Sequence, residues 1–223
     1  MPDITIEATD GHRLSALRLD PEGTPRGALV VIQEIFGVNE HIRAIAAMYA
    51  GLGYTTIAPA IFDRLERDTC LDYSGPSLEK GMRLSKSLGP NDVMLDLQAA
   101  VTAVADAGEV ATIGYCLGGA LSWRCAARLD GVSAAISYYG AQIPMFVAER
   151  PRVPIQFHLG QRDAYWPIDA ARELCGAVEV DHEVHEYDAD HGFACDHRPA
   201  VFEPRAAALA LQRTLRFLEA RLG

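Results

Sequence analysis

The chain has 223 residues, of which 49% are hydrophobic and 22% charged, and its formal net charge is −10 at pH 7. These values are typical of a globular protein with a sizeable apolar core. The negative charge argues against general affinity for nucleic acid or for an anionic membrane surface. No apolar run approaches the roughly 18 residues that span a bilayer, so no membrane segment is predicted.

The N-terminal stretch MPDITIEATDGHR contains early acidic residues and no apolar core, so we expect no secretory signal. The five cysteines are scattered and form no C-x-x-C pair, which predicts neither a disulfide framework nor a zinc knuckle. We therefore expect a cytoplasmic protein that needs no metal and no organic cofactor.

The predicted elements begin with two short strands, ITIEA and LSALRLD, joined by the turn TDGH. Short apolar runs without alternation then alternate with amphipathic helices. The runs that predict strands cover residues 28–33, 54–60, 110–115, 134–140, 154–160 and 182–188. The predicted helices cover residues 40–52, 92–107, 119–129, 167–178 and 204–221.

This pattern is typical of an α/β protein with a mostly parallel central sheet and helices on both faces. No repeat or linker interrupts it, so we predict a single domain over residues 1–223. Residues 61–90 fit the pattern least well and are expected to form an excursion with one short helix that lines a pocket.

The stretch ATIGYCLGGALSW carries the strongest functional signal. It places Cys116 between Gly114 and Gly118, in the G-x-nucleophile-x-G spacing that holds a nucleophile on a sharp turn between strand and helix. A lone cysteine after an apolar strand is usually an inert core residue. The three surrounding glycines, Gly119 included, indicate a crowded and specialised backbone, which favours a nucleophilic thiol.

Further polar residues follow the ends of other predicted strands, where sites form in sheets of this kind. Asp163 lies 47 residues after Cys116, and His191 lies 28 residues after Asp163. This order of nucleophile, acid and histidine is the one that α/β hydrolases use. The histidine would promote formation of the thiolate, and the carboxylate would orient the imidazole. The alternatives are that Asp163 caps a helix and that His191 is a satisfied loop residue.

Three more residues are candidates for the same site. Glu34 follows an apolar strand, and a buried carboxylate there is costly unless it is paired. The backbone N–H groups of Ile35 and Leu117 are candidates for an oxyanion hole. We interpret the remaining histidines, His41 among them, as satisfied structural residues, and Cys195 as structural or incidental.

Together these segments resemble the dienelactone hydrolase (carboxymethylenebutenolidase) family of the α/β-hydrolase fold. The matching segments are VVIQEIFGVNEHIR, YTTIAPAIFDR, IGYCLGGALS, LGQRDAYWP and DADHGFACDHRP. The resemblance implies Cys116 as nucleophile, His191 as base and Asp163 as its orienting acid. It also implies that Glu34 hydrogen-bonds the resting thiol and that Ile35 and Leu117 form the oxyanion hole.

Members of this family bind the substrate carboxylate with two arginines, one in the excursion and one just after the histidine loop. Here Cys195 stands directly after the segment His191-Gly192-Phe193-Ala194, and Arg198 follows three residues later. In the excursion Arg83 is the candidate and Arg64 the weaker one. The triad is thus assigned more firmly than the residues that bind substrate.

The sequence therefore predicts a monomeric cysteine hydrolase of a small lactone or ester, with dienelactone, opened to maleylacetate in aromatic compound degradation, as the leading substrate. The alternatives are a broad carboxylesterase for uncharged activated esters, a thiol redox protein and a non-catalytic relative that binds a ligand. A thiol redox protein would need a second, resolving cysteine. No such cysteine lies close to Cys116 in the sequence, which argues against this alternative.

Overall fold

The computed structural model describes residues 3–222. Its strands are β1 (Asp3–Glu7), β2 (Arg13–Leu19), β3 (Ala28–Ile32), β4 (Thr55–Pro59), β5 (Val110–Tyr115), β6 (Val132–Tyr138), β7 (Ile155–Gly160) and β8 (His182–Tyr187). Its α-helices are α1 (Glu40–Gly51), α2 (Gly75–Ser87), α3 (Asp92–Val104), α4 (Leu117–Arg128), α5 (Ile168–Gly176) and α6 (Pro204–Leu222). Three 3₁₀ turns, η1 (Ile61–Arg64), η2 (Ala105–Ala107) and η3 (Ile143–Phe146), complete the described elements.

All eight strands form one sheet in the order β1-β2-β4-β3-β5-β6-β7-β8. Strand β2 is antiparallel to both β1 and β4, and every other neighbouring pair is parallel. The predicted mostly parallel sheet is confirmed. Because β3, β5, β6, β7 and β8 run in the same direction, their carboxyl ends meet at one edge, where loops can form a site.

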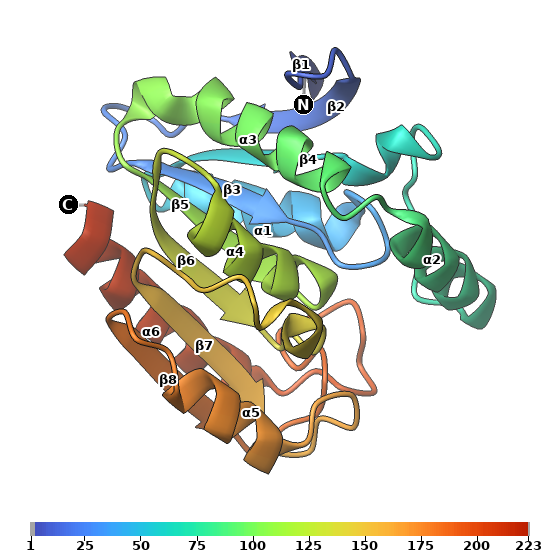
Figure 1. The fold of residues 1–223 in the computed structure, drawn as a ribbon, viewed down its shortest axis with the longest axis vertical. Helices are drawn as coiled ribbons and strands as arrows, with labels where there is room; N and C mark the ends of the chain where they lie inside the picture. The colour runs from blue at the N-terminus through green and yellow to red at the C-terminus, as the bar shows by residue number, and fades with distance from the viewer. Residues whose placement is uncertain (1–2, 223) are drawn as a thin grey trace.

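Helices cover both faces of the sheet, with α3, α4 and α5 on one face and α1 and α6 on the other (Figure 1). Strand β3 shows why its sequence does not alternate in polarity. Its residues Val30 and Ile32 pack with α3 and α4, whereas Leu29 and Val31 pack with α1 and α6. Both faces of the strand are therefore apolar.

The excursion between β4 and α3 packs closely against the loop that follows β3. A β-carbon on Gly81 of α2 would lie 2.2 Å from the carbonyl oxygen of Ile35, and one on Gly37 would lie 1.9 Å from that of Thr69. Such contacts leave no room for a side chain. A bridge between Gly37 and Cys70 adds backbone pairing. The excursion thus supports the loop that carries Glu34 and Ile35.

Several boundaries differ from the predicted ones. Helix α4 begins at Leu117, two residues before the predicted start, because the chain turns at Cys116 itself. Helix α3 ends at Val104, and the turn η2 occupies the last three residues of the predicted helix. In the excursion, α2 has 13 residues and is longer than the short helix expected. Among residues 3–222, no helix has both the length and the apolarity that crossing a membrane requires.

Arg64 has a structural partner rather than a place in a pocket. Its guanidinium holds the Asp96 carboxylate through two hydrogen bonds of 2.7 and 3.0 Å. Asp96 is fully buried, so its charge depends on this arginine.

We expect Arg64→Ala to lower the free energy of unfolding by about 3–5 kcal/mol, because it leaves the Asp96 carboxylate buried without a partner. Chemical denaturation checks this. Arg67→Ala is the control, since Arg67 is exposed and its ion pair with Asp63 is long at 3.7 Å; its cost should stay within about 1 kcal/mol. Equal costs for the two variants would contradict the expectation.

Candidate active site

Cys116 lies at the sharp turn between β5 and α4. Its backbone has φ 56° and ψ −112°, in the left-handed half of conformational space that side chains rarely adopt. Holding a residue there costs about 1–3 kcal/mol, which the surrounding structure must supply. The N–H of Cys116 donates to the carbonyl of Tyr138 at 3.0 Å, which ties the turn to the end of β6.

The glycines around Cys116 allow three backbone segments to meet. A β-carbon on Gly114 would lie 1.8 Å from the carbonyl oxygen of Gly118, and one on Gly118 would lie 2.2 Å from that of Ile32. No larger residue fits at either position without moving the backbone. The G-x-C-x-G spacing is therefore a packing requirement that places the thiol above the ends of β3 and β5.

His191 and Asp163 come from the loops after β8 and β7. The ring Nδ1 of His191 is 2.8 Å from Oδ2 of Asp163, and both side chains are buried. Because a carboxylate only accepts, Nδ1–H donates and Nε2 is left for another partner. The other oxygen, Oδ1, accepts the backbone N–H groups of Tyr165 and Trp166 at 2.8 and 3.3 Å. Asp163 therefore stabilises the turn that precedes α5 and also holds the imidazole of His191.

The charge state of His191 is set by its neighbours. Burial alone would lower its pKa, but the Cys116 thiolate and the hydrogen bond with Asp163 outweigh burial and raise the pKa to about 10. The rings of Tyr139 and Tyr165 meet the imidazole edge-on, with centroids 5.1 and 4.9 Å away. These neighbours favour the protonated, imidazolium form of His191.

Cys116 and His191 open into one pocket of about 270 Å³. Glu34, Ile35, Leu117 and Arg198 also line it. Leu117 is the first residue of α4, so its N–H has no acceptor within the helix and is free to bind an anionic oxygen. The structure thus brings together every residue predicted for the catalytic and oxyanion roles except Asp163, which lies behind His191.

Glu34 is fully buried, and its carboxylate is held by the excursion. Its Oε2 accepts the hydroxyl of Tyr73 at 2.9 Å, and the Tyr73 hydroxyl also receives the side-chain amide of Asn39 at 3.2 Å. Within residues 3–222 no hydrogen bond joins Glu34 to Cys116, in contrast to the predicted contact with the resting thiol. Tyr73 instead reaches one carboxylate oxygen from the excursion, and the other oxygen, Oε1, has no hydrogen-bond partner within residues 3–222.

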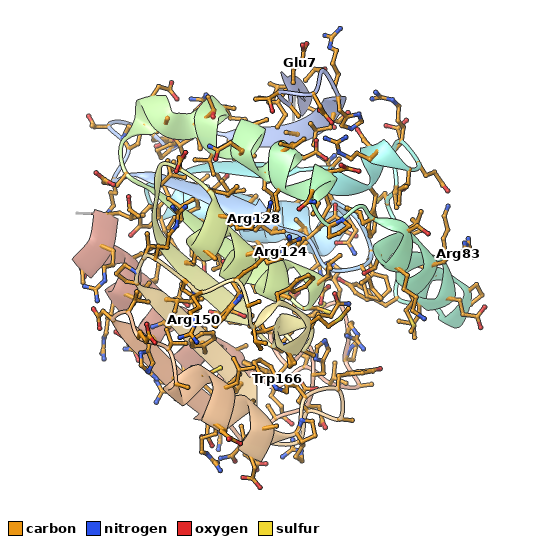
Figure 2. All side chains as sticks on the ribbon, viewed as in Figure 1. Glu7, Arg83, Arg124, Arg128, Arg150 and Trp166 are labelled. Carbon is orange, nitrogen blue, oxygen red and sulfur yellow. The ribbon has the colours of Figure 1, made fainter. Side chains whose placement is uncertain are left out.

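The two arginines expected to bind substrate are placed differently. Arg198 lines the pocket, and its guanidinium lies over the ring of Tyr73 at 5.7 Å. Arg83 is exposed on α2, the helix that projects from the sheet, and does not line the pocket (Figure 2). The next turn of α2 instead presents Lys86 to the pocket. Neither Lys86 nor Arg198 forms an ion pair within the described part of the chain.

Sequence reasoning missed Tyr73 and Lys86. Tyr73 stands in the loop DYSGP, which has no strand or helix pattern to fix its direction. Lys86 lies three residues after Arg83, and with 3.6 residues per turn the two side chains point about 60° apart around the helix axis, so the rotation of α2 decides which of them faces the pocket.

An eight-stranded, mostly parallel sheet with a buried histidine–carboxylate pair facing a residue at the strand–helix turn defines an α/β hydrolase. The model of the dienelactone hydrolase family matches residues 14–222. The chain belongs to this family and is an enzyme of the carboxylic ester hydrolase class.

Curated relatives support this assignment over nearly the whole chain. The carboxymethylenebutenolidase of Pseudomonas putida is 32% identical over 96% of this chain and 94% of its own length. Carboxymethylenebutenolidase 1 of Cupriavidus pinatubonensis is 30% identical over 96% of this chain and 95% of its own.

Solved structures share the fold. A Klebsiella pneumoniae protein assigned to the dienelactone hydrolases superposes with a TM-score of 0.80 at 26% identity and covers 97% of this chain and 98% of its own. An esterase from Pyrococcus furiosus has a TM-score of 0.71 at 16% identity and covers 100% of this chain and 93% of its own, which shows the fold alone.

We expect the pKa of His191, about 10 in the unmodified protein, to fall in Cys116→Ser, because the thiolate is the largest influence that raises it. NMR titration of the ring measures this. Because the folded state holds the His191 proton more tightly than the unfolded chain, this proton stabilises the fold. The stabilisation is fully present at pH values below the ordinary pKa of 6.5 and is lost as the pH rises toward 10. His191→Gln should therefore show a weaker fall in unfolding free energy between pH 7 and 10. An unchanged pKa in Cys116→Ser would contradict the close pairing.

Proposed function

We propose that the enzyme opens small activated lactones or esters through a thioester on Cys116, and that dienelactone, opened to maleylacetate, is the leading substrate. The observation that carries this proposal is that Cys116, at its strained turn, opens into the same pocket as His191, whose imidazole Asp163 holds from behind. The family relationship supports a lactone or ester substrate.

In the proposed first step the Cys116 thiolate forms a bond to the carbonyl carbon. The electron pair of the C=O bond moves to oxygen, and the N–H groups of Ile35 and Leu117 would bind that oxygen. When the carbonyl reforms, the C–O bond to the leaving oxygen breaks and a thioester remains. The leaving oxygen departs as a stabilised enolate and takes the proton of the His191 imidazolium, which leaves His191 neutral.

In the second step water attacks the thioester. His191, now neutral, takes a proton from the water, and Asp163 stabilises the imidazolium that forms. The C–S bond breaks, and the thiolate returns beside the imidazolium. No external oxidant, reductant or cofactor enters this balance.

The choice of cysteine restricts the substrates. A thiolate attacks readily but is also a good leaving group, so a tetrahedral intermediate with a poor alkoxide leaving group returns to substrate. An enol ester, as in a dienelactone, loses an enolate instead and moves forward. The proposed substrates are therefore activated esters rather than amides or simple alkyl esters.

Glu34 is proposed to hydrogen-bond the thiol of Cys116 in the free enzyme, and the thiolate forms when substrate binding moves Glu34 or Glu34 takes up the thiol proton. It is the carboxylate that lines the pocket with Cys116. In the structure Tyr73 binds Glu34, so this transfer requires the carboxylate to turn from Tyr73 toward the thiol.

The mechanism also needs a reduced Cys116, and all five cysteines are free, which supports a reducing cytoplasm.

A carboxylated substrate is supported by Arg198 and Lys86. Both are cations on the pocket wall, in a chain whose net charge is −10. The negative charge of the whole molecule repels an anionic substrate, and two local cations without acidic partners offset this repulsion at the pocket.

A broad esterase for uncharged activated esters is the second candidate, and the pocket mouth favours it. Leu78 and Met82 of α2 and Tyr165 line the pocket while remaining 37%, 44% and 68% exposed. Large apolar side chains in such positions suit a substrate with an apolar substituent.

Cys116→Ala should abolish hydrolysis of both dienelactone and an uncharged aryl acetate, with a fall in kcat of at least about 1,000-fold, because no thioester can form. Dienelactone is followed by the loss of its ultraviolet absorbance. Cys70→Ser is the control, since Cys70 is exposed and outside the pocket. Substantial turnover in Cys116→Ala would contradict the proposed nucleophile.

Arg198→Ala and Lys86→Ala should each raise KM for dienelactone by about 10-fold or more and change KM for the aryl acetate little, because only the first carries a carboxylate. Arg83→Ala tests the prediction from sequence in the same assay. A larger effect of Arg83→Ala than of Lys86→Ala would show that α2 presents a different face. Equal effects on both substrates would favour the broad esterase.

A further inference from the structure

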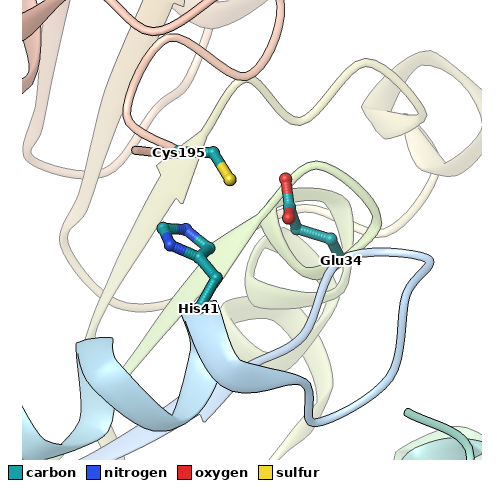
Figure 3. A group of neighbouring side chains, drawn as sticks. All are labelled: Glu34, His41 and Cys195. Carbon is teal, nitrogen blue, oxygen red and sulfur yellow. The ribbon is translucent and has the colours of Figure 1, made fainter. Parts of the chain in front are cut away.

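A second group of reactive side chains lies next to the catalytic pocket. Glu34, His41 and Cys195 point toward one another from three separate segments of the chain (Figure 3). One donor atom from each lies within 4.8 Å of the others, and the three residues are between 0% and 1% exposed. The group therefore presents oxygen, nitrogen and sulfur donors in a space closed to bulk water.

Two of these donors have no partner. Oε1 of Glu34 and Nε2 of His41 are buried and accept or donate no hydrogen bond within residues 3–222. Buried polar atoms are rarely left in this state, because each loses its hydration without compensation. Two unpartnered atoms in one small space are suited to bind a group that can contact both of them.

The hydrogen bond on the far side of His41 decides what that group is. Nδ1 of His41 is 3.2 Å from Oδ1 of Asp196, and because the carboxylate only accepts, Nδ1 carries the proton. In the tautomer that this hydrogen bond selects, Nε2 presents a lone pair, and Nε2 has no hydrogen-bond partner within residues 3–222. A lone pair and a carboxylate oxygen then face the same space, and a cation satisfies both.

The geometry points to a buried site for a thiolate-binding divalent metal ion, with Zn²⁺ the simplest choice, held by Glu34, His41 and Cys195. A carboxylate and a thiolate neutralise the two charges of the ion, and a water completes four-coordination. A carboxylate that holds the second ring nitrogen, as Asp196 does, is the usual support for a histidine ligand of zinc. On binding, the Cys195 S–H bond breaks and the proton passes to solvent.

Donors around a four-coordinate zinc are about 3.5 Å apart, as follows from bond lengths near 2.0–2.3 Å. Side-chain adjustments of about 1 Å therefore bring the three donors to this spacing. His41 and Asp196 line a second cavity of about 370 Å³, whose lining includes neither Cys116 nor His191.

The experiment uses the full chain carrying Cys116→Ser, so that the catalytic thiol does not bind zinc, and reads binding rather than activity. Its result is therefore independent of the proposed hydrolysis. Metal-free protein competes for Zn²⁺ with a chromophoric indicator. We expect one ion per chain, bound at least 100-fold more weakly after His41→Gln or Cys195→Ala. Asp196→Asn should weaken binding about 10–100-fold.

Three further variants serve as controls and should leave the affinity unchanged. His182→Gln and Cys70→Ser remove a histidine and a cysteine outside the group. His197→Gln addresses a neighbouring exposed group of His41, Asp196 and His197. Circular dichroism and thermal unfolding verify that each variant folds, and Cys195→Ser provides a nearly isosteric second test if Cys195→Ala does not.

Co²⁺ in place of Zn²⁺ gives an independent readout. Thiolate ligation should produce a near-ultraviolet charge-transfer band that disappears in Cys195→Ala. Absence of competitive zinc binding, or binding that Cys195→Ala leaves intact, would overturn the proposal. Loss of binding in His197→Gln would overturn it as well, because it would place the ion in the exposed group.

Discussion

The backbone conformation of Cys116 is the constraint on which the rest of the site depends. A residue at positive φ is held only where its surroundings leave it no alternative. Here the first turn of α4 is pressed against the ends of β3 and β6, with Gly118 against the carbonyl of Ile32 and Gly119 against that of Tyr138. The energy comes from the two apolar layers that clamp the sheet between helices. The thiol is therefore positioned by the whole central sheet rather than by its own loop.

The excursion plays a corresponding role for the other half of the site. The loop after β3 carries Glu34 and Ile35 and packs against residues of the excursion. Gly81 of α2 packs on the carbonyl of Ile35, and Tyr73 holds the carboxylate of Glu34. A segment that has no place in the alternating pattern of strands and helices thus orients an oxyanion-hole candidate and the buried acid. Changes in this segment are expected to alter the pocket without disturbing the sheet.

The fold and the close placement of Cys116, Asp163 and His191 could be predicted because each rests on local signals. Unalternating runs such as Ala28–Ile32 indicate strands buried on both faces, and the glycines around Cys116 mark a close approach of backbones. Positions that depend on helix rotation or loop direction could not be predicted. Whether Arg83 or Lys86 faces the pocket depends on how α2 is turned, and the place of Tyr73 depends on a loop without periodicity.

The environment of His41 was beyond sequence reasoning for a related reason. Its position on α1 fits an ordinary buried helix residue, and only the approach of the loop after β8 brings Asp196 and Cys195 to it. The same approach gives Glu34 two sets of neighbours. One oxygen belongs to the hydrogen-bond network of Tyr73 and the other faces His41 and Cys195. Because the carboxylate is rigid and planar, turning one oxygen toward Cys116 necessarily moves the other. Whatever occupies the space beside His41 therefore affects how readily Glu34 reaches the thiol, and the two sites share one carboxylate.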